Sequence, residues 1–283
     1  MKLDLDKNKI KSGLYIVSTP IGNLGDITLR ALQILDCSDY ILCEDTRIAR
    51  KILNYHKINT SLISNHKFNE KSNVEKIIKL IKSGKIISLI SDAGTPLISD
   101  PGNIILKECI INKLNVTPIP GVSSVTAAIS VSGFSSNFYF HGFIAEKKSQ
   151  IEKEFDILSN ISSSIVFFVS AKKFNKIIPL IKNFFLKRKI VICREITKFY
   201  EEFIRLDVKN LDVFSDNLKG EITVVISDEE KTEKNSFLLS ESDKHVISKL
   251  INKISIKDIC KIVDKENRIK KSLIYNYCLT LKK

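Results

Sequence analysis

Three short segments of the chain combine glycine, proline and hydroxyl side chains in a way that suits contact with a ligand. They are residues 18–23 (STPIGN), 91–96 (SDAGTP) and 120–124 (PGVSS), and each follows a run that is typical of a buried strand. Small residues let a ligand approach the main chain closely, and Asp92 adds a charge to the second segment. Strand-to-helix turns are rich in the same residues for structural reasons alone. Residues 91–96 by themselves therefore fit a ligand-binding loop and a plain connection equally well.

A fourth segment, Glu44-Asp45-Thr46-Arg47, brings two carboxylates and a guanidinium to the end of another apolar run. The structural alternative is that the carboxylates lie at the start of a helix and pair with Arg47. The sequence contains no G-x-G-x-x-G, no G-x-x-x-x-G-K-[ST] and no G-x-S-x-G pattern. Their absence argues against an ordinary dinucleotide site, a P-loop and a serine-hydrolase elbow.

The elements that position these segments are predicted from hydrophobic runs and periodicity. Strands are expected at residues 14–17, 40–43, 60–64, 86–90 and 116–119, with helices between them. In the first of these helices, one face is expected to carry Leu29, Leu32 and Leu35. Such alternation predicts a mostly parallel α/β sheet that brings the four segments to one edge. Residues 100–102 (DPG) are interpreted as the structural entry to the next helix.

A second α/β unit is predicted to begin near Phe138. Residues 199–206 and 221–227 are expected to be strands of an antiparallel portion, and residues 245–281 carry helical periodicity, with Ser255 as a possible cap. The predicted organisation is an N-terminal α/β domain at 13–121, a C-terminal α/β domain at 122–228, a linker at 229–242 and a small basic helical module at 243–283.

Composition narrows the class of protein further. The formal net charge of +13 and the pI near 9.3 favour a polyanionic partner, although the excess of Lys, Ile and Asn also fits an AT-rich coding sequence. Six cysteines without a closely spaced pair and four scattered histidines predict reduced thiols and no metal site. There is no apolar run of membrane-spanning length and no apolar signal core, so a cytoplasmic protein without membrane contact is expected.

Several segments, taken in their order along the chain, carry a resemblance to a known family. They are residues 18–28, 44–47, 91–102 and 120–124, extended by Gly142-Phe143 with Lys147, by residues 194–198, by Gly220-Glu221, and in the tail by Lys270-Lys271 and Tyr275. Together they resemble the ribosomal RNA small subunit methyltransferase I family, within the tetrapyrrole methylase superfamily. The resemblance covers residues 13–227 closely and the tail loosely.

The resemblance implies S-adenosylmethionine as the methyl donor and the ribose 2′-hydroxyl of a cytidine as the acceptor. That cytidine would lie in the decoding region of 16S ribosomal RNA, offered as free RNA or within the 30S subunit. The resemblance also implies two α/β domains with the cofactor in the cleft between them, and a homodimer. The residues expected to hold the cofactor are Pro20, Asp92, Ala93, Gly94, Thr95, Pro96, Ser123 and Ser124.

For the reaction that the resemblance implies, alignment of the two reactants should supply most of the rate. A base can assist removal of the hydroxyl proton, and the candidates are Glu44, Asp45 and Glu195. Contacts to RNA phosphates are expected from Arg30, Arg47, Lys147 and Arg194. A structural ion pair is the equally weighted alternative for Arg47 and Arg194.

The sequence departs from the family pattern in one region. Relatives usually carry an acidic residue where Val169 stands, His-Arg in place of Lys172-Lys173 and Pro-Ala in place of Ala145-Glu146. A catalytic role for an acid at position 169 therefore cannot apply to this chain. The lysines keep positive charge there.

Two rival interpretations remain at this point. A methylase of corrin-type tetrapyrroles would have a neutral or acidic cleft and no basic C-terminal module. A non-enzymatic nucleic-acid-binding protein would use residues 243–283 as a helix-turn-helix, with the α/β part as a sensor or scaffold.

Overall fold

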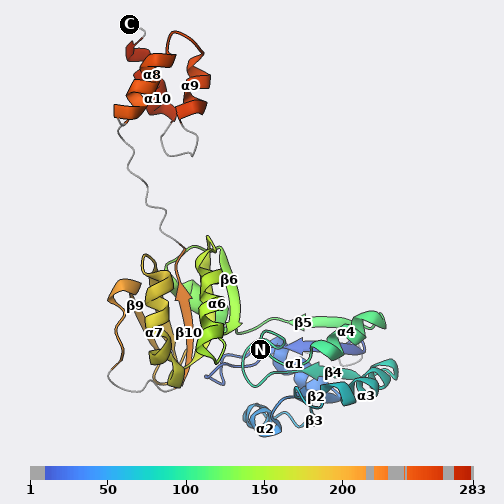
Figure 1. Cartoon of the computed structure of the whole chain (residues 1–283). Coiled ribbons are helices and arrows are strands. Elements are labelled where there is room, and N and C mark those ends of the chain that lie inside the picture. The colour runs from blue at the N-terminus through green and yellow to red at the C-terminus, as the bar shows by residue number, and fades with distance from the viewer. Residues whose placement is uncertain (1–9, 215–219, 229–238, 240, 264–270, 282–283) are drawn as a thin grey trace. The chain divides into compact units, whose positions relative to one another are not determined.

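The computed structural model describes residues 10–214, 220–228, 239, 241–263 and 271–281. The chain divides into two compact units, residues 1–229 and 230–283 (Figure 1). The first unit contains two five-stranded sheets, and the second consists of helices. This is the α/β fold class expected from the sequence, with additional C-terminal helices.

The first sheet is wholly parallel, as its alternation of strands and helices predicts. Its strand order is β3-β2-β4-β1-β5. The strands are β1 (Gly13–Val17), β2 (Tyr40–Cys43), β3 (Ser61–Ser64), β4 (Ile86–Leu89) and β5 (Val116–Ile119). Its helices are α1 (Leu29–Cys37), α2 (Thr46–Tyr55), α3 (Glu70–Lys82) and α4 (Asn103–Ile111).

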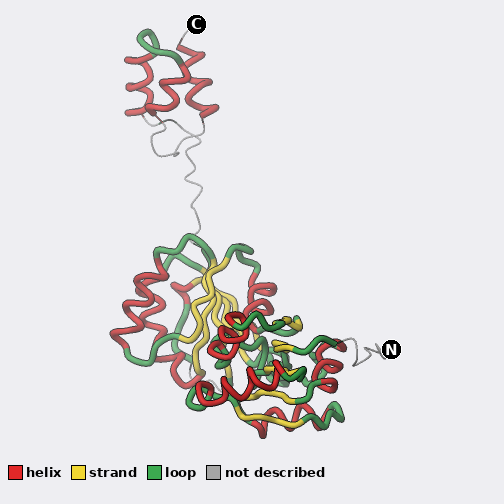
Figure 2. Tube along the Cα trace, turned by 90° about the vertical axis from the view of Figure 1, so that its right-hand side faces the viewer, coloured by secondary structure: helices red, strands yellow, loops and turns green. Residues whose placement is uncertain are grey.

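Each face of the first sheet is covered by two helices. Alternate strand residues point to opposite faces, so Val17 and Ile41 pack with α1 and α2, whereas Leu14 and Ile87 pack with α3 and α4. Because both faces are covered, the strands are mainly apolar, and β4 is buried along its whole length. In Figure 2 the strands of the first unit (yellow) lie between helices (red).

Helix α1 corrects one detail of the sequence prediction. Its N-cap is Thr28, whose hydroxyl accepts a hydrogen bond from the main-chain N–H of Ala31. The buried residues are Ala31, Ile34 and Leu35, while Leu29 is 53% exposed. The expected stripe through Leu29 was wrong, because a residue in the first turn after the cap points away from the sheet in this helix.

The second sheet has the order β6-β7-β10-β8-β9, and β6 and β7 are its parallel pair. Its strands are β6 (Phe138–Phe143), β7 (Ser164–Ser170), β8 (Lys189–Arg194), β9 (Glu202–Asp207) and β10 (Glu221–Ile226). Helices α6 (Lys148–Ser159) and α7 (Ala171–Phe185) cover one face around Phe155, Phe167 and Phe174. Helix α5 (Ser124–Ser132) covers the other face through Val125 and Ala128.

The antiparallel portion is confirmed, with one shift. Strand β9 begins at Glu202, so Phe199 and Tyr200 precede it and are largely exposed. Two aromatic residues in sequence are typical of a strand, but here they lie in the connection after β8. Their exposure leaves them outside both hydrophobic cores of the second sheet.

The C-terminal unit has its own small core, around Ile247, Ile259 and Ile274. Its helices are α8 (Glu241–Leu250), α9 (Ile256–Val263) and α10 (Lys271–Leu281). The Ser255 hydroxyl accepts a hydrogen bond from the main-chain N–H of Asp258 at 3.2 Å, which is the cap expected from the sequence. Most of the proposed linker (229–238 and 240) and Lys270 lie outside the described residues, and α8 already begins within the range assigned to the linker.

Candidate functional site

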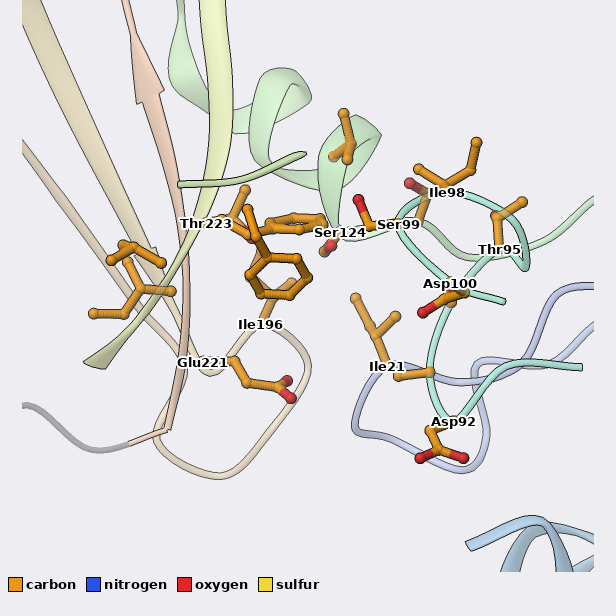
Figure 3. A pocket seen from close by; sticks show the side chains of 18 of the residues that line it. Ile21, Asp92, Thr95, Ile98, Ser99, Asp100, Ser124, Ile196, Glu221 and Thr223 are labelled. Carbon is orange, nitrogen blue, oxygen red and sulfur yellow. The ribbon is translucent and has the colours of Figure 1, made fainter. Parts of the chain in front are cut away.

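A pocket of about 480 Å³ lies in the first unit, where loops of the first sheet face strand ends of the second. Figure 3 shows Ile21, Asp92 and Asp100 on one side, and Ile196, Glu221 and Thr223 on the other. Ile21 lies in the loop after β1, and Asp92 and Asp100 lie in the loop after β4. This is the edge at which open parallel sheets bind ligands, and the volume is in the range of small-molecule sites.

The loops that the sequence places at one edge are hydrogen-bonded to one another. Thr19 and Gly94 exchange two main-chain hydrogen bonds, of 2.9 and 3.0 Å. The Thr95 hydroxyl donates to the Val122 carbonyl at 3.1 Å and lies 3.1 Å from the Ser18 hydroxyl. Gly94 has φ +78°, a conformation that side chains disfavour. The segments at 18–23, 91–96 and 120–124 therefore form one wall.

The pocket lining is acidic although the chain is basic. Four carboxylates line it, Glu44, Asp92, Asp100 and Glu221, and no Lys, Arg or His is among the described residues of the lining. Its remaining polar groups are hydroxyls and main chain, including Thr95, Ser123 and Ser124. Such a lining favours a cationic ligand and disfavours a phosphate.

Burial raises the pKa of three of these carboxyls. For Glu44 and Asp92, loss of hydration on burial is the main cause, and repulsion from neighbouring carboxylates adds to it. The pKa of Asp100 rises to about 6, chiefly because it is buried and further because Glu44 and Asp92 are near, although a hydrogen bond with Ser91 opposes the shift. A cation in the pocket would relieve this repulsion.

Most of the expected cofactor residues lie at this pocket. Asp92, Ala93, Gly94, Thr95, Ser123 and Ser124 line it. Pro20 and Pro96 are buried next to lining residues and are not part of the lining. The neighbour of Pro20, Ile21, supplies the apolar surface there.

The three candidate bases are in different environments. Glu44 lines the pocket, whereas Asp45 caps α2 and is held by Arg47, whose Nη2 lies 2.6 Å from the Asp45 carboxylate. Hydrogen bonds from the Arg47 side chain and main chain are the main cause that lowers the pKa of Asp45 to about 2. Such a carboxylate is a weak proton acceptor.

Glu195 is engaged in a structural network outside the pocket lining. Its carboxylate accepts hydrogen bonds from Lys198 Nζ at 3.0 Å and from the Glu221 main-chain N–H at 2.9 Å. Burial raises the pKa of Glu195, but these hydrogen bonds and the nearby positive charges outweigh it, and the net pKa is lowered. The network positions Ile196 and Glu221, which line the pocket.

The basic residues expected to contact RNA lie outside the pocket lining. Arg47 pairs with Asp45 and is 87% exposed, and Arg194 Nη1 lies 2.9 Å from Glu202 Oε2. Both pairs are the structural alternative that the sequence left open. Arg30 and Lys147 are exposed, and Lys147 occupies the N-cap position of α6.

Sequence reasoning missed several lining residues. The interpretation of residues 100–102 is right for Gly102, which is the N-cap of α4, and incomplete for Asp100, which lines the pocket. Phe168, Val169 and Thr223 also line it, and their apolar runs carry no signal that separates them from ordinary core. Position 169, where the resemblance implies an acid, is Val169, an apolar part of the wall.

The described residues contain no group of three or more His, Cys, Asp or Glu arranged to hold a metal ion. Among the same residues, no helix has the length and apolar character needed to cross a membrane.

Comparison with known proteins places this fold and site in a family. The family model for tetrapyrrole (corrin/porphyrin) methylases matches residues 13–212. Diphthine synthase has a similar fold, with a TM-score of 0.60, 15% identity and coverage of 76% of this chain and 89% of that one. A uroporphyrin-III C-methyl transferase from Thermus thermophilus, solved with S-adenyl homocysteine, has a TM-score of 0.55 at 12% identity, covering 76% and 97%.

Two sequence relatives share far more identical residues with this chain than these solved structures do. Ribosomal RNA small subunit methyltransferase I of Rickettsia prowazekii is 40% identical over 250 residues, which is 87% of this chain and 89% of that protein. The protein of the same name from Thermotoga maritima is 40% identical over 220 residues, which is 77% of this chain and 99% of that protein. The second relative is thus short enough to have room for the first unit alone.

These findings decide between the rival interpretations. The acidic pocket agrees with what the corrin-type alternative predicts, so the charge of the pocket does not argue against that alternative and the decision rests on the sequence relatives. The relatives that share 40% of their residues over most of this chain are named for ribosomal RNA methylation, and the tetrapyrrole enzymes share only the fold. The chain therefore belongs to the tetrapyrrole methylase family and, within it, to the ribosomal RNA small subunit methyltransferase I enzymes.

Proposed function

We propose that this chain transfers the methyl group of S-adenosylmethionine to the ribose 2′-hydroxyl of a cytidine in the decoding region of 16S ribosomal RNA. The cofactor assignment rests mainly on the acidic pocket, which has no Lys, Arg or His among the described residues of its lining, in a chain whose net charge is +13. The RNA substrate is supported by the names of the sequence relatives.

The residues of the pocket fit S-adenosylmethionine, whose sulfonium cation, ammonium group and carboxylate leave it with a net positive charge. Asp92, Asp100 and Glu44 would stabilise positive charge, while Thr95, Ser124 and the main chain around Gly94 offer hydrogen bonds. Ile21, Phe168 and Ile196 form apolar surface suited to a purine ring. When bound, the cofactor supplies an electrophilic methyl group.

The chain's own contribution is to align the acceptor and to take its proton. Holding the hydroxyl in line with the methyl group accounts for most of the expected acceleration. Glu44 is the candidate base that lines the pocket, and its raised pKa strengthens it as a proton acceptor. Asp45 and Glu195 are already engaged by Arg47 and Lys198, so we place them in structural roles.

The test is methyl transfer from labelled S-adenosylmethionine to undermethylated 30S subunits, followed by nuclease digestion and mass spectrometry of the nucleosides. Label in the ribose of a decoding-region cytidine is expected. No label in 16S RNA would overturn the proposal, and label in a base would overturn the 2′-O assignment. Naked 16S RNA, run in parallel, decides whether the free RNA or the assembled subunit is the substrate.

We also propose that the enzyme is a homodimer and acts in the cytoplasm, where ribosomal subunits are assembled. Light scattering on the purified protein should give twice the 32.1 kDa of one chain. A mass of one chain at micromolar concentration would contradict the dimer.

A second role is proposed for the C-terminal unit, as an accessory RNA-binding module. Lys249, Lys253 and Lys257 are exposed, and no ion pair involves them among the described residues. Since the relative from Thermotoga maritima has room for the first unit alone, the module is expected to add affinity without being needed for methyl transfer.

A further inference from the structure

We propose that a second pocket of the first unit binds a nucleotide of the RNA substrate, next to the nucleotide that is methylated. Its volume is about 560 Å³, and its charged lining residues are Lys148, Lys173, Lys176 and Glu146. The proposal rests on the proposed function, because it identifies where that substrate lies.

The two pockets adjoin. Phe143, Val169 and Ser170 line both of them, so one wall separates the acidic pocket from the lysine-lined pocket. An RNA whose ribose hydroxyl reaches the cofactor at this wall can therefore place a neighbouring nucleotide, with its phosphate, in the second pocket. The residues of the common wall come from the ends of β6 and β7.

The charge of the second pocket suits phosphate. Lys176 makes no ion pair within the described part of the chain. Lys173 Nζ lies 2.6 Å from Glu146 Oε1, and Lys148 Nζ lies 3.8 Å from Glu152 Oε1. The Glu146 side chain is 84% exposed, and exposed pairs of this kind contribute little to stability. A phosphate can replace the carboxylate partners at small cost.

Two helices begin at this pocket and add to its positive potential. Helix α6 starts at Lys148 and α7 at Ala171. Neither N-cap residue, Lys147 or Ser170, forms a side-chain hydrogen bond to the first turn. The unpaired N–H groups and the helix dipoles therefore favour an anion near both starts.

The rest of the lining is apolar, which favours a nucleotide over a bare anion. Ile144, Ile151, Ile177 and Leu180 supply aliphatic surface. Phe143, at the common wall, is 64% exposed, and exposed aromatic rings stack on bases of single-stranded RNA. Lysines beside an aromatic ring and aliphatic side chains fit a nucleotide's phosphate and base together.

The experiment compares the full-length protein with the triple variant K148Q/K173Q/K176Q. A matched control, K153Q/K182Q/K187Q, removes three lysines from the same two helices and the turn after α7, outside both pocket linings. Methyl transfer to undermethylated 30S subunits is measured at several salt concentrations. Affinity for S-adenosylmethionine is measured by calorimetry.

The triple variant is expected to raise KM for 30S subunits at least tenfold and to leave kcat within about threefold. Its salt dependence should weaken by about 0.7 to 1.4 in the log–log slope, because one nucleotide offers at most two flanking phosphates and each phosphate contact to single-stranded RNA contributes roughly 0.7. Cofactor affinity should be unchanged, and the control should keep KM within about twofold.

Equal KM values for the triple variant and the control would overturn this proposal while leaving the proposed function intact. Loss of cofactor affinity in the triple variant would also overturn it, since the lysines would then serve the first pocket. If the unmodified enzyme transfers no label to the RNA, the proposed function fails, and this inference fails with it.

Discussion

The two adjoining pockets of the first unit differ in charge although they share three residues. One is lined by four carboxylates, with no Lys, Arg or His among its described residues. The other is lined by three lysines and one carboxylate. Charges of opposite sign are thus separated across the ends of β6 and β7. This difference shows that the net charge of +13 does not predict the charge of an individual binding site. A ligand interacts mainly with the charges within a few ångströms of it.

The two sets of charges also differ in how they are held. Asp92 and Asp100 are partly buried beside other acids, which raises their pKa values, whereas Lys148 and Glu146 lie at the surface. A buried carboxylate cluster gains from a cation that remains bound. Exposed lysines suit a polymer that must be released after each reaction. The predictions below test this contrast, beginning with the largest effect.

Asp92→Ala should weaken the binding of S-adenosylmethionine by at least 100-fold. The change removes a lining charge and the acceptor of the Asp45 main-chain N–H, 3.2 Å away. Calorimetry measures the affinity, and Asp36→Ala on the exposed face of α1 is the control. Asp92→Asn separates charge from hydrogen bonding. Unchanged affinity in folded Asp92→Ala would remove Asp92 from the site.

Glu44→Gln should lower kcat about 100-fold, the usual contribution of a general base. In the unmodified enzyme the rate should rise with pH through the pKa of Glu44, which burial raises above its ordinary value. Single-turnover rates across pH measure both effects. If Glu44→Gln retains the full rate and pH profile, alignment alone drives the transfer.

Asp100 should make cofactor binding depend on pH. Its pKa is about 6, so affinity for the cationic cofactor should fall as pH drops through 6 and the carboxylate becomes neutral. Asp100→Asn should bind more weakly at pH 7.5, by about tenfold, and show no change near pH 6. Calorimetry between pH 5 and pH 8 measures this, and an unaltered pH dependence in the variant would assign it to another group.

Ionised Asp100 should strengthen cofactor binding but lower the stability of the fold. The raised pKa means that folded Asp100 holds its proton to higher pH than in the unfolded chain, so the free energy of unfolding falls as pH rises from about 4 to 6. Asp100→Asn should therefore stabilise the protein by about 2 kcal/mol at pH 7.5, with little effect at pH 4. Urea unfolding at the two pH values measures it.

Removal of residues 230–283 should have the smallest effect. The first unit has its own cores, and the Thermotoga maritima relative, which has room for that unit alone, is named as a ribosomal RNA small subunit methyltransferase I. Cofactor affinity should be unchanged, and KM for 30S subunits should rise only a few-fold. A complete loss of transfer by the folded truncated protein would show that the C-terminal unit takes part in the site.

Much of the fold could be predicted from local sequence. Strands β1, β2, β4 and β5 and the helices between them follow from apolar runs and helical periodicity, which neighbouring residues determine. The prediction failed where a local pattern had two solutions, as at Leu29, which is exposed, and at Phe199 and Tyr200, which lie before β9. In these places packing against distant elements decides the outcome.

By itself, the sequence determined the parallel sheet, the loops at 18–23, 91–96 and 120–124, and their place at one edge, because turn chemistry is local and a helix between successive strands makes them parallel. Only the tertiary structure showed that Asp100 joins Asp92 in the pocket, that Glu221 faces them, and that Glu195 is occupied by Lys198. It also showed the separation of acidic and basic pockets. The physical reason is that charge acts through space: carboxylates far apart in the sequence, such as Glu44 and Asp100, come close enough on folding for one to raise the pKa of the other.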